Sequence, residues 1–386
     1  MTPKEYFVNN FENAIMEIPE EYLAKLMKLS SYDLHVMEAM QTNFPYSNDY
    51  SFNMLIESLK EKSVYKIDDS IYVGKVKNPM PNCYTVNNEN ISGSLICYTT
   101  GMSENVNLFA QTLVAIFLGE TLGLDRNVVL MYVDLLLFEI ERRIHYEYGG
   151  KIFTNTYVDL AMELLRNDNI YAILLKGSSC STVMDSVLIL HEYAHYVMGT
   201  SIRGTNLEVK KLSIGAVSIY CKLCQEHTEM VTLPKDEIIA DIMALLLLTN
   251  GYDLNVMEIM SVFIAFLQLS GMSLNDEYTN KHRLKVIHYF FKDSSEYKEY
   301  RNEIEYAIRV FTEIIDSASA EMYDEDKLTQ GFITVIKSII DESSLPVAEK
   351  YRLINDYVEK DTTSILKCAL EESQLESVDS SEFEVF

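Results

Sequence analysis

Two histidines and a glutamate stand close together in an apolar stretch of this 386-residue chain. The segment His191-Glu192-Tyr-Ala-His195 has the pattern H-E-x-x-H. Residues i and i+4 lie one above the other on a helix, so both imidazoles can bind one metal ion. Glu192 lies about 100° round the helix from His191. We therefore expect its carboxylate beside an open coordination position, where it can take a proton from the attacking water as a general base.

A pair of acidic residues at the same spacing can supply the third ligand of such a site. Glu237 and Asp241 lie at i and i+4 in the segment Lys235–Leu248 and share one face of a predicted buried helix. One carboxylate can bind the metal, and the other can accept the second ring N–H of a ligating histidine. An ordinary helix start after Pro234 explains Glu237 well and Asp241 poorly, because burying the Asp241 carboxylate without a partner would be costly.

Polar and small residues suggest the limits of the histidine-bearing helix. Thr182 can cap its start, with Asp185 three residues later in a position like that of a capping box. Gly199 is placed to end the helix in a left-handed turn. We predict that residues 177–181 (GSSCS) form a loop leading into this helix.

The two motifs together resemble those of the gluzincin metallopeptidases whose third ligand lies in a Glu-x-x-Ala-Asp helix, here Glu237 to Asp241. This group includes HtpX-type, prenyl-protein-processing and phage-exclusion Lit-type peptidases. The resemblance implies a zincin-like core in which His191, His195 and Glu237 hold Zn²⁺. It also implies that Asp241 supports the ligands from outside the coordination shell.

An upstream segment adds to this resemblance. Residues 81–85 (PNCYT) and 93–102 are similar to the edge strand and hairpin of the same families. The resemblance implies that substrate backbone adds as a strand along Asn82, Cys83 and Tyr84. Cys83 departs from the pattern, because these families usually have alanine there.

The group that would stabilise the developing oxyanion stays open at this point. In similar gluzincins a stretch containing His and Arg follows the third-ligand helix and returns to the cleft. His227, Tyr278, His282 and Arg283 are candidates, but the usual His-Pro start is absent here. We assign none of them a role, and a surface position is the favoured alternative for each.

The six cysteines form no disulfide-dense pattern, which is typical of a reducing cytoplasm. Cys221-x-x-Cys224-x-x-His227 invites a second metal or redox site. No second pair of ligands lies nearby, so we expect instead that these cysteines are buried on one helix face.

Composition excludes several function classes. A net charge of −26 is unsuited to binding nucleic acid and disfavours anionic membranes. The N-terminus lacks the apolar region of a secretory signal. The apolar stretches Val106–Leu124 and Ile259–Leu274 are interrupted by polar residues, so we predict buried helices rather than membrane spans. The expected localisation is cytoplasmic.

A hydrophobic fraction of 48% with few Gly and Pro predicts a mainly α (α+β) fold with a large core. A small β-sheet or hairpin would lie over the active-site helix, and one long helix would cover Arg126–Tyr148. The predicted regions are an N-terminal helical region (1–66), a gluzincin-like catalytic domain (67–290, with a helical insert at about 104–176), C-terminal helices (291–370) and an acidic tail (371–386).

These features predict a zinc-dependent endopeptidase that cuts a specific protein substrate, in phage defence or in regulation. The acidic surface hints weakly at a basic protein partner. The alternative is a zinc-stabilised binding or scaffold protein with a silent peptidase site. Glu192 speaks against this alternative, because purely structural zinc sites usually have four protein ligands.

Overall fold

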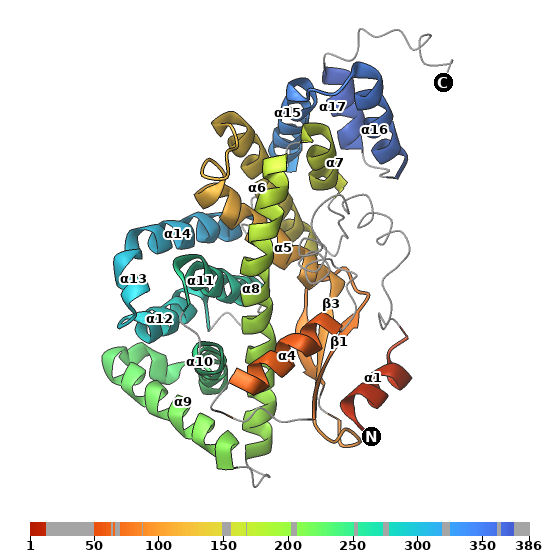
Figure 1. The fold of residues 1–386 in the computed structure, drawn as a ribbon. Helices are drawn as coiled ribbons and strands as arrows, with labels where there is room; N and C mark the ends of the chain where they lie inside the picture. Colours follow the sequence, from red (N-terminus) through yellow and green to blue (C-terminus); the bar gives the residue numbers. More distant parts are fainter. Residues whose placement is uncertain are drawn as a thin grey trace. The chain divides into compact units, whose positions relative to one another are not determined.

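The computed structural model of the chain consists mainly of α-helices with one small sheet, which confirms the predicted mainly α class (Figure 1). The chain forms two compact units. The first combines Met1–Asn107 with Ser178–Glu313, and the second combines Leu108–Gly177 with Ile314–Phe386. The structure describes residues 1–12, 50–62, 65, 70–86, 88–148, 156–166, 168–201, 207–250, 254–272, 278–318, 325–360 and 364–373.

The sheet of the first unit has three strands in the order β1-β3-β2. β1 (Ile71–Val76) runs parallel to β3 (Ser94–Thr99), and β2 (Cys83–Val86) runs antiparallel to β3. The predicted hairpin is therefore present, and β2 is an edge strand. Gly93, at the end of the β2–β3 connection, has a φ of 133°, a conformation that favours glycine.

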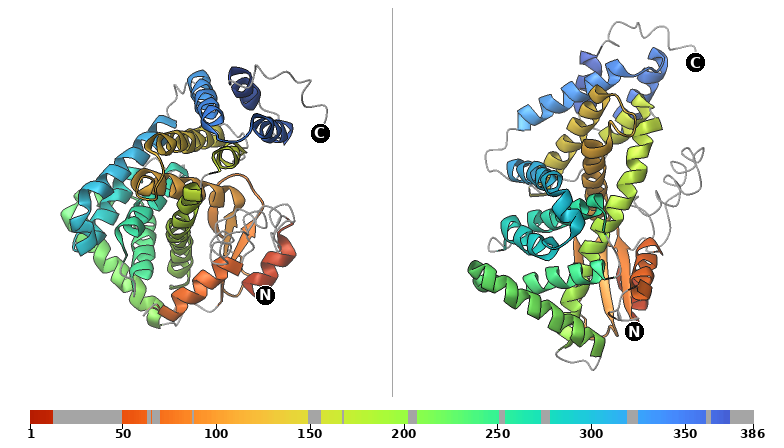
Figure 2. Two further views of the ribbon diagram at one scale, coloured as in Figure 1. Left: turned by 45° about the horizontal axis from the view of Figure 1, so that its top comes forward. Right: turned by 60° about the vertical axis from the view of Figure 1, so that its left-hand side comes forward.

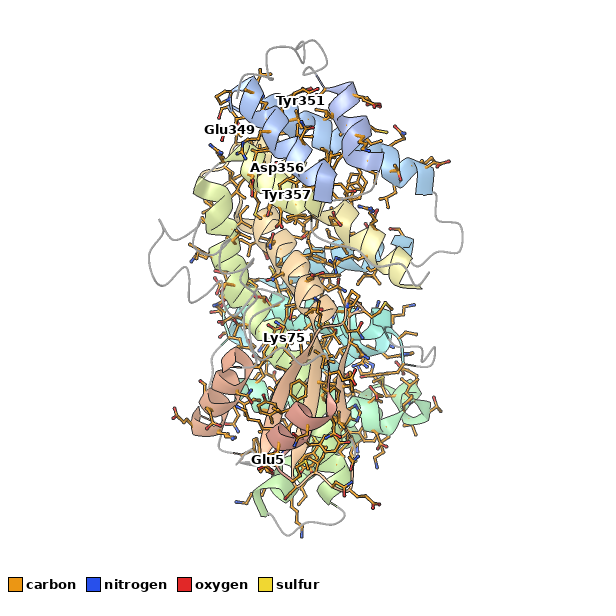
Figure 3. All side chains as sticks on the ribbon, turned by 90° about the vertical axis from the view of Figure 1, so that its right-hand side faces the viewer. Glu5, Lys75, Glu349, Tyr351, Asp356 and Tyr357 are labelled. Carbon is orange, nitrogen blue, oxygen red and sulfur yellow. The ribbon has the colours of Figure 1, made fainter. Side chains whose placement is uncertain are left out.

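Both faces of this sheet are covered, since every residue of β1 and β3 is buried. On one face, Phe7 of α1 (Pro3–Asn10) packs in a cluster with Tyr72 and Cys97. The other face meets the long helix α8, where Tyr98 donates its hydroxyl to Asp185. Lys75, the register partner of Tyr98 on β1, is also fully buried (Figure 3).

The helix α8 runs without a break over Asp168–Ser201, so the predicted boundaries were wrong. Thr182 and Ser181 lie inside the helix and donate their hydroxyls to the backbone oxygen of Ser178, at 2.9 and 3.0 Å. This bonding within the helix satisfies the hydroxyls that the sequence suggested as caps. Gly177 and Gly199 are helical as well, so residues 177–181 form no loop.

Part of α8, Ala172–Gly199, is long and apolar enough to cross a membrane. It differs from the two stretches that the sequence singled out. Of its most apolar 18-residue segment, 67% is buried inside the protein. The core helix of a soluble protein can be equally long and apolar.

Several helices of the first unit lie beside one another on the side of α8 away from the sheet (Figures 1 and 2). α10 (Lys235–Thr249) packs against α9 (Leu207–Glu226) and α12 (Asn280–Phe291), and α12 also packs against α11 (Val256–Met272). The remaining elements that contribute residues to this unit are α4 (Tyr50–Lys62), part of α5 (Thr100–Leu118), η1 (Thr228–Thr232), α13 (Ser295–Glu299) and most of α14 (Arg301–Ala318).

The second unit is helical among its described residues. Its α6 covers Arg126–Tyr148, the bounds predicted from the sequence. α15 (Glu325–Glu342) packs against α6, α7 (Thr156–Leu165) and α17 (Ser364–Glu372), and α16 (Val347–Lys360) packs against α7 and α17. Most of the predicted helical insert falls in this unit. The predicted tail from Gln374 onward and residues 13–49 of the predicted N-terminal helical region lie outside the described residues.

Candidate metal centre

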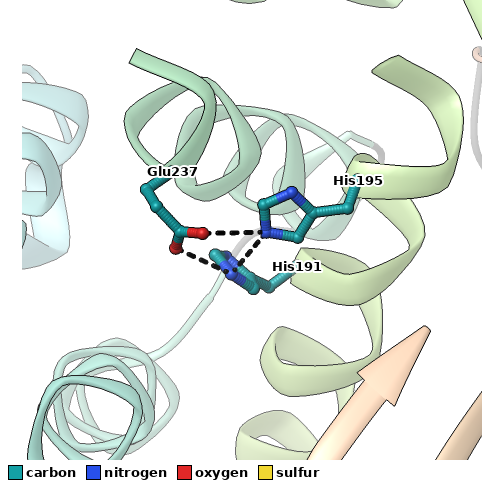
Figure 4. Close-up of side chains that lie close together, drawn as sticks. All are labelled: His191, His195 and Glu237. Atoms are coloured by element: carbon teal, nitrogen blue, oxygen red, sulfur yellow. Dashed lines mark hydrogen bonds and ion pairs between the residues drawn. The ribbon is translucent and has the colours of Figure 1, made fainter. Parts of the chain in front are cut away.

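Three predicted ligands meet in the first unit. The two Nε2 atoms of His191 and His195 on α8 lie 3.1 Å apart. Glu237 of α10 places Oε2 at 3.5 Å from His191 Nε2 and Oε1 at 3.4 Å from His195 Nε2. Figure 4 shows the three side chains turned toward one another. Ligand atoms about 2.0–2.1 Å from a tetrahedral metal are separated by about 3.3–3.4 Å, so this group could hold a metal ion.

The arrangement follows from local sequence. The spacing of four residues stacks the two imidazoles on one face of α8. Pro234 caps α10 and places Glu237 in its first turn, where a carboxylate interacts favourably with the helix dipole. The His191 side chain is buried, whereas those of His195 and Glu237 are 29% and 33% exposed. The group is therefore reachable from solvent on the side of His195 and Glu237.

Asp241 lies one turn after Glu237 and is fully buried. Its Oδ1 is 2.8 Å from Nδ1 of His191, the ring nitrogen that faces away from the ligand group. An ionised carboxylate only accepts hydrogen bonds, so this contact favours the tautomer with the proton on Nδ1. The Nε2 lone pair of His191 is then free to bind a metal.

Arg283 and Tyr278 complete the surroundings of the two carboxylates. The buried Arg283, on α12, donates from Nη1 to Asp241 at 2.5 Å and from Nη2 to Glu237 Oε2 at 3.1 Å. The Tyr278 hydroxyl donates to Asp241 Oδ2 at 2.7 Å, and the guanidinium lies 4.7 Å from the centre of the Tyr278 ring. Arg283 therefore binds both carboxylates and Tyr278 binds Asp241. Both side chains are buried, so the surface positions expected for them were wrong.

The two other oxyanion candidates make local contacts. Nδ1 of His282 lies 3.3 Å from the Thr279 amide nitrogen and 3.1 Å from its hydroxyl, at the start of α12. Nδ1 of His227 lies 3.8 Å from a carboxylate oxygen of Glu229. These contacts favour structural roles for both histidines.

The charges of the group suit a bound cation. Burial lowers the pKa of His191, but contacts with Asp241 and Glu237 outweigh burial and raise the pKa to about 9. The contact with His191 lowers the pKa of Glu237 to about 2, against the effect of burial. Burial lowers the pKa of His195, and the charge on His191 lowers it further. The two carboxylates exceed the single positive charge of Arg283, so a metal cation would replace the proton on His191 as the balancing charge.

Glu192 is half-buried and points to the edge strand. Its Oε2 accepts the backbone N–H of Thr85 at 3.0 Å. The Thr85 hydroxyl donates to the backbone oxygen of Glu192 at 2.7 Å and lies 3.3 Å from Oε2. β2 is therefore attached to the residue directly after His191, the first candidate ligand. This contact could not be predicted from the sequence, because a threonine on an edge strand is common.

The other edge-strand residues differ in exposure. Cys83 is buried, with Sγ 4.0 Å from the backbone oxygen of Leu188. Burial raises the pKa of its thiol, and the charge of Glu192 raises it further. Asn82 is exposed and Tyr84 is half-buried. Cys83 thus faces α8 in the position where a small alanine would be expected.

The cysteine pair of α9 is not part of a metal-ligand group within the residues that the structure describes. Cys221 is exposed and Cys224 is half-buried, so the expected burial of both was wrong. The face that they share is partly open to solvent because α9 packs against α10 with its opposite side, which carries the buried Leu212, Ala216 and Leu223.

Comparison with known proteins adds no relative, since no protein-family model, curated protein or solved structure matches this chain.

Proposed function

We propose that the protein is a zinc-dependent endopeptidase of the gluzincin kind. The observation that carries this proposal is the group of three side chains, His191, His195 and Glu237, whose nitrogen and oxygen atoms lie 3.1 to 3.5 Å apart. Glu192 follows His191 in the chain and is bonded to the edge strand. Two imidazoles and one carboxylate suit zinc, although other divalent metals bind the same donors. The partial exposure of His195 and Glu237 favours an open site over a closed structural one.

Each side chain has a distinct part in this proposal. His191, His195 and Glu237 would hold Zn²⁺, which supplies Lewis-acid polarisation and lowers the pKa of water. Glu192 takes a proton from the water that attacks the peptide carbonyl and passes it to the leaving amine. Asp241 keeps His191 in the required tautomer, and Arg283 fixes both carboxylates. A substrate strand would add along β2, the edge of the sheet.

The decisive comparison is between the natural chain and Glu192→Gln. Gln keeps the size and a hydrogen-bond acceptor but cannot accept the proton. We expect both proteins to bind one zinc ion, and the variant to lose at least about 10²-fold in cleavage rate. Each would be incubated with a whole-cell protein extract, with and without chelator, and new protein termini would be mapped by mass spectrometry. Equal cleavage by both proteins would exclude Glu192 as the base.

The scaffold alternative predicts a different ligand-binding result for the same metal site. A peptidase site keeps one coordination position for an exogenous ligand, so acetohydroxamate should bind to the zinc-loaded chain. Stoichiometric zinc with no hydroxamate binding and no new termini would favour a binding protein with a silent site.

A further inference from the structure

Thr85 of the edge strand β2 contacts Glu192 of α8 through two groups, its backbone amide and its hydroxyl. The Thr85 amide donates to the carboxylate at 3.0 Å, and its hydroxyl donates to the backbone oxygen of Glu192 at 2.7 Å. The bond from the amide fixes the end of the Glu192 side chain, and the bond from the hydroxyl fixes the position of the helix backbone. Together they restrain a side chain that otherwise has three rotatable bonds.

The strand register explains why this amide is directed outward. Asn82 bonds to Thr99 on β3, with the Thr99 amide donating to the Asn82 oxygen at 3.0 Å. In an antiparallel pair, residues alternate between bonding inward and outward. Tyr84, two residues after Asn82 and opposite Cys97, therefore bonds inward to β3, whereas Thr85 directs its amide away from the sheet. Glu192 therefore occupies the acceptor position at Thr85, and an added substrate strand would pair with β2 at Cys83, the preceding outward-directed residue.

We propose that Thr85 is the positioning residue for Glu192, holding the base carboxylate on the edge-strand amide and the helix backbone on its hydroxyl. This inference rests on the proposed peptidase function. Thr85 does not itself transfer a proton. It acts by limiting the positions of Glu192, and pre-organisation of a catalytic group in this way contributes to rate without adding a reacting atom.

The contact itself is tested by amide hydrogen exchange in the zinc-loaded full chain. Glu192→Ala removes the acceptor, so one amide of the peptide covering β2 should exchange about tenfold faster, as expected for the loss of one hydrogen bond. The peptide covering β3 should not change. Glu229→Ala is the matched control, because the exposed Glu229 contacts Lys285 rather than β2. Unchanged exchange of β2 in Glu192→Ala would overturn the proposal.

The positioning role is tested by a double-mutant cycle with acetohydroxamate as the probe, because Glu192 would accept the hydroxamate proton. Thr85→Val removes the hydroxyl and should weaken binding about tenfold, and Thr85→Ser should restore it. In a Glu192→Gln background, Thr85→Val should have little further effect, because both changes act through the same group. Thr112→Val is the control, since that hydroxyl also donates to a backbone oxygen at 2.7 Å but in α5.

These measurements distinguish an incorrect role for Thr85 from an incorrect proposed function. Thr85 is not a positioning residue if the natural chain binds hydroxamate and Thr85→Val binds it equally well. The same holds if Thr85→Val lowers the hydroxamate affinity by one and the same factor in the natural and the Glu192→Gln backgrounds. If the natural chain binds zinc but neither binds hydroxamate nor cuts protein, the peptidase function is wrong. Hydrogen exchange then still decides whether Thr85 holds Glu192.

Discussion

The carboxylate of Asp241 lies 2.8 Å from Nδ1 of His191, and we expect it to set which ring nitrogen faces the ligand group. Asp241→Asn keeps the shape but loses the charge, and its amide can rotate to present a donor instead. We expect zinc affinity to fall about 10–100-fold, the usual effect of losing such a partner. Competition with a chromophoric chelator measures this affinity.

The control for this prediction is Asp236→Asn, the same chemical change at an exposed position in the first turn of α10. Its affinity should stay within about twofold of the natural value, because a surface charge in that turn is worth less than about 1 kcal/mol. Equal affinities for the two variants would mean that Asp241 does not orient His191.

Arg283 donates hydrogen bonds to two carboxylates from inside the protein, with its side chain only 3% exposed. Arg283→Met keeps much of the volume but leaves Asp241 and Glu237 without their cation. Breaking a buried pair by removing one partner destabilises a protein by about 3–5 kcal/mol. We expect urea unfolding of the metal-free variant to show a loss of this order.

Lys285→Met is the matched control on the same helix. Lys285 pairs with Glu229 at 2.5 Å, but the two side chains are 35% and 45% exposed. Exposed pairs contribute about 0–1 kcal/mol. A loss in Arg283→Met no larger than in Lys285→Met would show that the buried carboxylates do not depend on this cation.

Only part of the candidate site could be predicted from residue types and their spacing. The spacings of His191 and His195, and of Glu237 and Asp241, are helix geometry, and the structure brings all four together. Asp241 also implied a buried partner, because an isolated buried carboxylate is costly. A ligating histidine was the partner expected from the sequence, and Arg283 was not foreseen as a second partner, because that contact depends on where α12 packs.

At the scale of elements, Gly74 shows how closely α1 approaches the sheet. A Cβ at this position would lie 2.5 Å from Cε2 of the buried Phe7 ring. Gly74→Ala should therefore destabilise the protein by about 1–3 kcal/mol through overpacking, which outweighs the gain of about 0.5–1 kcal/mol from replacing a strand glycine. Chemical denaturation measures the loss. Zinc affinity should not change, because Gly74 faces α1 rather than α8.

Two further variants isolate the packing cause. Phe7→Leu combined with Gly74→Ala should lose less stability than the sum of the single changes, because leucine removes the ring that the added Cβ would overlap. Gly199→Ala adds a Cβ with no atom within 4 Å, so it should stabilise the helix by about 0.5–1 kcal/mol. Additive losses in the double variant would mean that the ring does not limit the space at Gly74.

Elements with strong local patterns were predicted well, and those decided by distant contacts were not. Arg126–Tyr148 had the predicted bounds because no Gly or Pro interrupts it. In α8, the Gly, Ser and Thr residues near 177–182 resembled a helix start, but burial and hydroxyl bonding within the helix kept it continuous. The hairpin was visible in the sequence, whereas the parallel pairing of β1 with β3 was not, because parallel partners are set by a crossover rather than by a turn.

At the scale of the whole molecule, charge is the dominant feature: 58 acidic residues stand against 32 basic ones. Like charges repel more strongly in the compact state than in the unfolded chain, so a net charge of −26 opposes folding. Salt screens this repulsion, since the Debye length falls from about 10 Å at 0.1 M to about 3 Å at 1 M. Salt also weakens exposed ion pairs such as Arg301–Glu305, but each contributes only about 0–1 kcal/mol.

We therefore expect the thermal midpoint of the metal-free chain to rise as NaCl increases from about 0.05 to 0.5 M. Over this range the Debye length becomes shorter than the distance between neighbouring surface charges. Chelator in every sample keeps metal binding from contributing. The control is a variant with several exposed acidic residues of α14 and α15 changed to their amides, such as Glu303, Glu313 and Glu342. Having less charge to screen, it should start from a higher midpoint and gain less from salt. A midpoint that falls with salt would mean that specific ion pairs outweigh the net repulsion.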